Sequence, residues 1–217
     1  MGQKINPKGF RLGPVFTWGS RWYADGRRYK ELFLLDVKLR ETLFVKLKMA
    51  GLAEVGIERS INKVKVTLHV ARPGVVIGRG GTGLEDLKKY IESFMAQLDK
   101  KKEAQGRLKL DVAVEPVKEP NINAYLVATM VADQLAKRLP AKRVGNQAIE
   151  RVMAAGAKGA RILLAGRIGG AEIARRERFQ AGTVPLSTIR EKVDYAAVPS
   201  LTRSGYIGVK VWICRKS

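Results

Sequence analysis

The chain is poor in the residues that carry metal, redox and disulfide chemistry: its 217 residues include one cysteine, Cys214, and one histidine, His69. A lone cysteine excludes an internal disulfide, and these two residues cannot supply the four protein ligands of a structural zinc site. Both fall in alternating apolar segments, so we interpret them as ordinary strand positions. The sequence therefore predicts no metal, no cofactor and a reducing compartment.

Acidic residues are also scarce, since 20 Asp and Glu face 41 Lys and Arg and leave a net charge of +21. Residues 1–116 hold 23 basic and 13 acidic side chains, a balance of +10, and residues 117–217 hold 18 and 7, a balance of +11. Solubility of a small domain requires a net charge of only about 2–8. A positive excess along both halves indicates an extended polyanionic partner, which we expect to be nucleic acid.

Long apolar runs and catalytic signatures are absent too. No segment approaches the roughly 18 apolar residues of a membrane span, so no membrane association is predicted. The sequence contains no Walker-type phosphate loop, zinc-protease helix or serine-nucleophile elbow. We therefore expect a protein that is not an enzyme and has no small-molecule substrate.

The N-terminal region is basic and broken by glycine and proline. Its first 30 residues contain one acid, Asp25, and the glycines and prolines exclude the amphipathic helix of a transit peptide. We predict that residues 1–27 form a basic arm that orders on RNA. Its aromatic residues are consistent either with stacking on bases or with burial against the domain: Phe16, Trp18, Trp22 and Tyr23.

The most informative segment is Gly78-Arg79-Gly80-Gly81, which lies between an alternating strand at 64–70 and an amphipathic helix that starts near Thr82. Glycines let a polyanion backbone approach closely because they have no Cβ atom. The arginine and the N–H groups at the following helix start can contact a phosphate. The segment therefore predicts a loop that binds a nucleic-acid backbone.

The same loop also matches the dinucleotide fingerprint G-x-G-x-x-G. That fingerprint requires the glycines to follow a strand directly and an acid about 20 residues later, at the end of the next strand. Here Pro73 and Gly74 place a turn before the loop, and the candidate acids fall before the next strand or too far along it: Asp99, Glu103, Asp111 and Glu115. A nucleotide-cofactor protein is the weaker alternative.

Periodicity predicts an α+β chain of two domains. In residues 28–116 we expect a helix over 28–50, three strands, a short helical turn and the helix after the glycine loop, giving a three-stranded sheet with helices on one face. Residues 117–120 read as a proline-bounded linker. Residues 121–217 are predicted to form a second α+β domain with helices over 121–139 and up to 156, and strands over 160–165, 183–195 and 206–214.

Two further basic clusters occur in the second domain. Four cations surround Pro140 between the two predicted helices: Lys137, Arg138, Lys142 and Arg143. The helix dipole accounts for the first two but not for the two that follow the break. A second cluster, Arg175, Arg176 and Arg178, is placed on an irregular loop. Residues 166–170 echo the glycine loop, and we weigh a tight turn equally with an RNA contact there.

The order strand, short helix, G-x-x-G, helix, strand resembles the K-homology (KH) domain, and the preceding helix and strand resemble its type II variant. Over nearly the whole chain the sequence resembles the bacterial-type family of small-subunit ribosomal protein three. The segments that carry this resemblance lie at 1–13, 71–81, 166–175, 184–186, 194–195 and 208–212.

This resemblance implies a structural protein of the small-subunit head that binds small-subunit rRNA and lines the channel by which mRNA enters. Its partners would be rRNA, mRNA and neighbouring head proteins, on ribosomes of the cytoplasm or of an organelle. Lys142 and Arg143, with Lys137 and Arg138, would face mRNA, although Asn146 replaces a third family cation. The expected rRNA contacts are Arg175, Arg176, Arg178, Lys4, Lys8 and Arg11. A free KH-type RNA-binding regulator is the runner-up.

Overall fold

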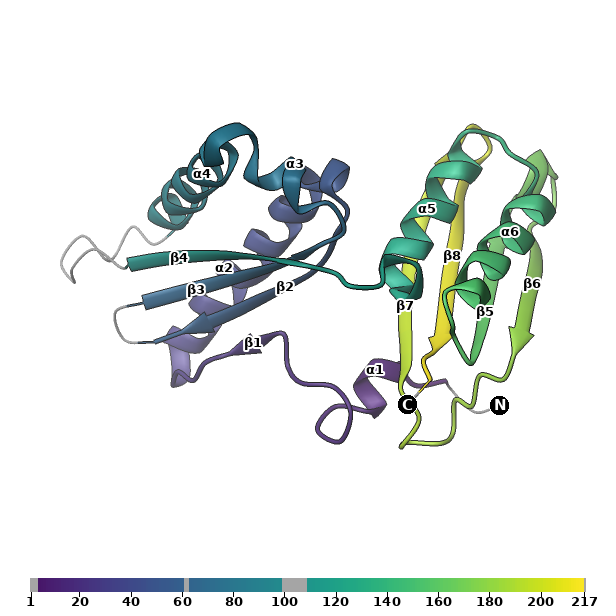
Figure 1. Cartoon of the computed structure of the whole chain (residues 1–217), viewed down its shortest axis with the longest axis horizontal. Coiled ribbons are helices and arrows are strands. Elements are labelled where there is room, and N and C mark those ends of the chain that lie inside the picture. The colour runs from purple at the N-terminus through teal and green to yellow at the C-terminus, as the bar shows by residue number, and fades with distance from the viewer. Residues whose placement is uncertain (1–3, 61–62, 99–108, 217) are drawn as a thin grey trace. The chain divides into compact units, whose positions relative to one another are not determined.

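The computed structural model describes residues 4–60, 63–98 and 109–216, which form two compact units (Figure 1). The 18–118 unit runs from Trp18 to Lys118. The C-terminal unit combines the described residues before Trp18 with those from Glu119 onward. The boundary between Lys118 and Glu119 falls inside the predicted 117–120 linker.

The 18–118 unit is a four-stranded sheet of order β1-β2-β3-β4, in which β2 and β3 are antiparallel and β3 and β4 are parallel. The two-residue strand β1 adds to the three predicted strands by pairing parallel to β2. Its elements are β1 (Ser20–Arg21), α2 (Gly26–Lys46), η1 (Lys48–Ala50), β2 (Leu52–Arg59), β3 (Lys63–Val70), α3 (Pro73–Ile77), η2 (Arg79–Gly81), α4 (Thr82–Leu98) and β4 (Lys109–Pro116).

The core of this unit follows from the period-two pattern of β3, whose alternate residues Val64–Val70 are buried while Lys65, Thr67 and His69 are partly exposed. The buried side of β3 packs against the apolar faces of α2 and α4. Leu39 on α2 and Ile91 on α4 are both fully buried there. Helices thus cover one face of the sheet, as the sequence predicts.

The C-terminal unit is a wholly antiparallel sheet of order β6-β5-β8-β7. Helices α5 and α6 lie across one face of it (Figure 1). Its elements are α1 (Pro7–Phe10), η3 (Pro120–Ile122), α5 (Ala124–Ala136), α6 (Ala141–Ala154), β5 (Gly159–Gly166), η4 (Ile168–Gly170), β6 (Arg175–Gly182), β7 (Val193–Thr202) and β8 (Gly205–Cys214). The core joins both helices to the sheet, with Val131, Ile162 and Val211 fully buried.

The described part of the predicted 1–27 arm, from residue 4 onward, is divided between the two units. Arg11 is fully buried, and its guanidinium donates to the backbone carbonyls of Pro7, Pro185, Leu186, Thr188 and Glu191 at 2.8–3.1 Å. These bonds fix the segment around α1 to the C-terminal unit. Beyond Thr17 the chain enters the other unit, where β1 joins the sheet.

Two predictions for the second half were wrong, one of a strand and one of a loop. Most of the strand predicted at 183–195 is a loop, because four of its carbonyls accept hydrogen bonds from Arg11 instead of a neighbouring strand. Conversely, the arginines predicted to lie on an irregular loop are on β6, an edge strand. Apolar alternation in the sequence does not reveal this strand, because only Phe179 and Ala181 of it pack against the core.

Candidate nucleic-acid interface

The glycine loop lies at an exposed turn between α3 and α4. Arg79 is exposed, and Gly80 and Gly81 adopt φ values of 63° and 84°, in the left-handed region that favours glycine. Apart from the adjacent residues of the chain, a Cβ atom on either glycine would have no heavy atom of the protein within 4 Å. The loop therefore presents a cationic side chain beside two backbone positions that a ligand can approach closely.

The flanking glycines hold the two helices together. A Cβ atom on Gly83 would lie 2.6 Å from the carbonyl oxygen of Val76, and one on Gly78 would lie 3.1 Å from the amide nitrogen of Gly83. Gly78 also has φ of 69° as the residue that ends α3. Glycine at 78 and 83 therefore serves the close α3–α4 contact, whereas Gly80 and Gly81 leave open space.

The geometry departs from a dinucleotide site. Helix α3 stands between β3 and the glycines, whereas the dinucleotide turn follows its strand directly. Asp111 forms an ion pair with Lys63 at 3.0 Å, and Glu115 lies 3.4 Å from Nδ1 of His69. Both candidate acids of β4 thus have partners on β3, while Asp99 and Glu103 lie outside the described residues.

The cations around Pro140 are all exposed, and they lie on both sides of the break between α5 and α6. Lys137 caps the end of α5, where a cation is favourable. Lys142 and Arg143 lie in the first turn of α6, which contains no acid. The positive end of the helix dipole disfavours cations there. Their position is thus electrostatically costly for the isolated fold and suited to an anionic ligand.

Helix α6 is held close to β6 at Gly145. A Cβ atom at this position would lie 2.5 Å from the ring of Phe179, so only glycine fits without moving the ring. Phe179 belongs to the strand that carries Arg175, Arg176 and Arg178. Figure 1 shows the α5–α6 connection at the same end of the unit as the start of β6. The two basic clusters of this unit therefore share one end of it.

Arg138 has a strained backbone. Its φ is 63°, the only positive value among the described non-glycine residues, and its N–H and that of Leu139 close the end of α5 through Leu135 O and Gln134 O. Glycine is the usual residue at this helix end. We expect Arg138→Gly to raise the free energy of unfolding by up to about 1 kcal/mol, because the left-handed conformation costs other residues roughly that much.

The same change removes a cation, so we also expect it to weaken RNA binding. Chemical denaturation and RNA titration of the full chain measure the two effects. Arg138→Ala is the control, since it removes the charge and keeps the strain. A glycine variant less stable than the alanine variant would contradict this reading of the turn.

The echo of the glycine loop at 166–170 is a tight turn. Its Gly169 and Gly170 have φ values of 67° and 84°, close to those of Gly80 and Gly81. However, Nε of Arg167 donates to the carbonyl of Ala171 at 2.8 Å, so this side chain stabilises the turn to which it belongs. No helix follows this turn, because the chain continues into β6.

The predicted N-terminal contacts fall into different environments. Lys4 is exposed, and Lys8 forms an ion pair with Asp194 at 3.1 Å while its side chain stays 40% exposed. Arg11 is fully buried and donates its hydrogen bonds to protein carbonyls. Burial also lowers the pKa of the Arg11 guanidinium. Arg11 therefore organises the fold and does not present its charge to RNA.

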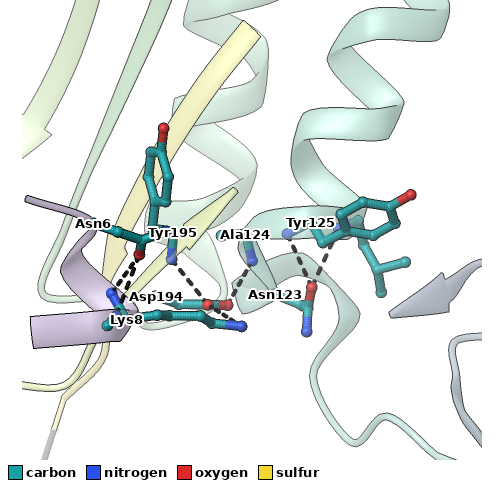
Figure 2. A network of polar contacts seen from close by, with 9 residues as sticks. Asn6, Lys8, Asn123, Ala124, Tyr125, Asp194 and Tyr195 are labelled. Atoms are coloured by element: carbon teal, nitrogen blue, oxygen red, sulfur yellow. Dashed lines mark hydrogen bonds and ion pairs between the residues drawn. The ribbon is translucent and has the colours of Figure 1, made fainter. Parts of the chain in front are cut away.

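Figure 2 shows how Asp194 joins three elements of the C-terminal unit. Its carboxylate accepts from the N–H of Ala124 at 2.9 Å and pairs with Lys8, while Asn123 accepts from the N–H groups of Tyr125 and Leu126. Asp194 and Asn123 thus satisfy the first donors of α5. The network fixes α1 and β7 to the start of the helix whose other end carries Lys137 and Arg138.

Two of the four N-terminal aromatics are exposed, while Phe16 and Trp22 are only partly so. Trp18 is 68% and Tyr23 85% exposed. Trp22 is partly buried and donates Nε1–H to the buried carboxylate of Asp36 at 2.8 Å. The structure therefore assigns a packing role to Trp22 and leaves Trp18 and Tyr23 accessible.

The two residues considered for nucleophilic chemistry lie on strands. His69 is on β3, and Cys214 ends β8, where burial raises the pKa of its thiol. Among the described residues, no group of three or more His, Cys, Asp or Glu is arranged to hold a metal ion. No helix in the described ranges is long and apolar enough to span a membrane.

Comparison with known proteins supplies the decisive observation. A KH-domain family model matches residues 38–122, and the model of the ribosomal protein S3 C-terminal domain matches residues 131–213. The small ribosomal subunit protein uS3 of Desulforamulus reducens is 45% identical over 213 residues, covering 98% of this chain and 91% of the relative. The chain belongs to the ribosomal protein S3 family.

Two further S3 relatives match over similar lengths. The uS3 proteins of Desulforudis audaxviator and Bacillus thuringiensis (strain Al Hakam) are 45% and 46% identical over 215 residues, covering 99% of this chain and 94% and 93% of the relatives. The S3 family consists of structural proteins of the small ribosomal subunit and not of enzymes. The KH and S3 matches confirm the predicted fold class, a KH domain followed by a second α+β domain.

Sequence reasoning missed two cations of the C-terminal unit, Arg161 on β5 and Lys210 on β8. Both lie on strands that are otherwise apolar, and both point to the sheet face opposite the helices. The signal was present in the sequence, because each cation occupies the outward position of a period-two pattern whose inward positions are apolar. It can be interpreted only once the strand order β6-β5-β8 is known, because this order places Arg161 and Lys210 on one face with the arginines of β6.

Proposed function

We propose that this S3-family protein is a structural component of the small-subunit head, where it binds small-subunit rRNA and lines the channel through which mRNA enters. Its partners are rRNA, mRNA and neighbouring head proteins, and it acts ribosome-bound in the cytoplasm. Family membership and a net charge of +21 divided between both halves of the chain support this proposal.

The observation that carries the mRNA assignment is the placement of Lys142 and Arg143 in the first turn of α6. Cations at a helix start are unfavourable for stability, by about 0.3–1 kcal/mol each. Lys137 and Arg138 lie at the end of α5, before Pro140, and all four side chains are exposed. This 137–143 patch suits a phosphate backbone that passes across the end of the C-terminal unit.

The glycine loop has a separate role in the proposal. Arg79 contacts a phosphate, while Gly80 and Gly81 allow the backbone of RNA to reach the start of α4. On β6, Arg175, Arg176 and Arg178 contact rRNA, as do Lys4 and the exposed part of Lys8. These contacts are electrostatic and therefore depend strongly on salt.

The 137–143 patch is tested by Lys142→Gln/Arg143→Gln on small subunits that carry the variant protein. We expect movement along mRNA to slow several-fold at a stable hairpin and to stay near the unaltered rate on unstructured mRNA, because the cations hold single strands at the channel. The measurement is the ratio of the two translation rates on matched templates.

The matched control is Arg190→Gln/Lys192→Gln, which removes two exposed cations from the loop at the other end of the unit. We expect that control to leave the ratio unchanged. Equal ratios for both double variants would contradict the assignment of the 137–143 patch to mRNA.

A further inference from the structure

Helices α5 and α6 cover one face of the C-terminal sheet. Among the described residues, the opposite face is covered at one end, where Val193 and Cys214 are buried against Val184 of the loop before β7. Cross-strand neighbours in a sheet share a face, so the register identifies that face directly. Ile162 pairs with Phe179 and Val211, and these belong to the side that packs under α5 and α6. Arg161 and Leu163 alternate with Ile162 and therefore belong to the opposite, open face.

The open face carries four cations. Leu163 pairs with Arg178 on β6 and with Lys210 on β8, while Ala165 pairs with Arg176. Arg161 lies one row further along β5, beside Gln180. Arg176, Arg178 and Lys210 are exposed, and Arg161 is partly exposed.

Acids are absent from this face within the described strands. The four strands contain two acids, Glu177 and Asp194. Glu177 pairs with Leu164, and Asp194 pairs with Ile213, so both belong to the side that the helices cover. No carboxylate of the described strands therefore shares this face with the four cations, and Glu191 of the loop before β7, which reaches its covered end, contacts the Cys214 thiol and pairs with Lys158.

Two of the arginines converge on one neutral acceptor. The Oε1 atom of Gln180 accepts from Nε of Arg161 at 3.0 Å and from a terminal nitrogen of Arg178. Burial, and then the charge of Arg178, lowers the pKa of Arg161. Like-charged guanidinium groups repel each other, and an amide oxygen offsets this less than an anion does. The pair is arranged as a receptor for an anionic group.

The spacing of the cations fits a chain of anions better than a single one. Arg176 and Arg178 are two residues apart on β6, or about 7 Å along the strand, and Arg178 and Lys210 are two strands apart, or about 10 Å. Phosphates of one nucleic-acid strand recur roughly every 3.4 Å along a helix axis. Several phosphates of one segment can therefore contact the four cations together.

We propose that this open sheet face binds the sugar-phosphate backbone of RNA through Arg161, Arg176, Arg178 and Lys210. The inference rests on the proposed function, which assigns β6 to rRNA, and extends that contact across β5 and β8. An RNA ligand is favoured over a protein because charged residues occupy the central row Arg178–Leu163–Lys210. The cores of protein–protein interfaces are depleted in charge.

The test is a titration of small-subunit rRNA with the full chain over a range of salt concentrations. The main variant is Arg178→Gln/Lys210→Gln, since both side chains are exposed and their loss does not threaten folding. We expect its affinity to fall at least tenfold at low salt and its log–log salt slope to decrease by about 1.4–1.8, the contribution of two phosphate contacts. Arg161→Gln tests the receptor pair separately.

The matched control is Lys38→Gln/Arg151→Gln, which removes two exposed cations from α2 and α6. We expect it to keep the salt slope of the unaltered chain. If the main variant keeps that slope while the unaltered chain binds rRNA, the open-face inference is wrong and the rRNA assignment stands. If the unaltered chain does not bind rRNA, the proposed function itself fails.

A third outcome also overturns the inference. The main variant could bind naked rRNA as the unaltered chain does and yet fail to join small subunits. That result would assign the open face to a protein neighbour instead of RNA.

Discussion

Asp36→Ala is expected to lower the free energy of unfolding of the 18–118 unit by about 3–5 kcal/mol, because it leaves a buried arginine without its counter-charge. Asp36 is 2% exposed and accepts from Nε of Arg59 at 3.1 Å and from Nε1 of Trp22 at 2.8 Å. The Arg59 side chain is only 7% exposed, so water cannot replace the lost carboxylate. Ser20 on β1 also bonds to Asp36 at 3.3 Å.

Hydrogen exchange of β2 and β3 in a urea series of the full chain measures this loss within one unit. Glu58→Ala is the control, since Glu58 forms an exposed ion pair with Arg21 at 3.4 Å. Exposed pairs contribute about 0–1 kcal/mol. If Asp36→Ala costs no more than Glu58→Ala, the buried carboxylate does not hold this unit together.

Arg11→Met is expected to destabilise the C-terminal unit by at least about 3 kcal/mol, because each buried carbonyl left without a donor costs about 1–3 kcal/mol. Methionine keeps a similar length and supplies no hydrogen-bond donor. We expect the region around α1 and the 183–192 loop to lose protection together, since the guanidinium bonds to both. Limited proteolysis and hydrogen exchange at these two segments measure the change.

Lys4→Met is the matched control, because it removes an exposed cation from the same segment. It should leave the protection of the 183–192 loop unchanged. Equal protection of that loop in both variants would contradict the role assigned to Arg11. Arg11→Lys keeps the charge with fewer, differently arranged donors, so an intermediate loss is expected.

Local patterns are sufficient to predict the 18–118 unit in outline. The alternation of β3, the glycine loop and the helical spacing of α2 each describe contacts between near neighbours in the chain. The two-residue strand β1 is too short for any periodicity, and it exists because Ser20 pairs with Ile57. The sequence therefore predicts three strands where the structure has four.

The C-terminal unit is harder to predict because distant residues decide its geometry. Arg11 reads as one more cation of a basic segment, yet its acceptors lie up to 180 positions away. The 183–192 carbonyls that it binds cannot then serve a strand. Successive side chains of β6 point in turn to the open, charged face and to the face under the helices. Such a charged segment resembles a loop in the sequence, and only its pairing with β5 identifies it as a strand.

The candidate RNA contacts also differ in how far the sequence predicts them. Exposure of Arg79, Lys142 and Arg143 follows from their places at turns and helix starts, which sequence identifies. Arg161 and Lys210 could not be assigned to a surface, because their shared face depends on the strand order β6-β5-β8-β7. The positive φ of Arg138 likewise depends on how α5 ends.

The most direct test of the account is quantitative co-sedimentation of the full chain with small ribosomal subunits after a high-salt wash. Cationic proteins held only by non-specific contacts lose roughly 10³–10⁵ in affinity as salt rises. We expect retention of one copy per small subunit, because an integral protein is held by many contacts at once. Release into the supernatant would contradict the ribosomal role and favour a free KH-type RNA-binding regulator.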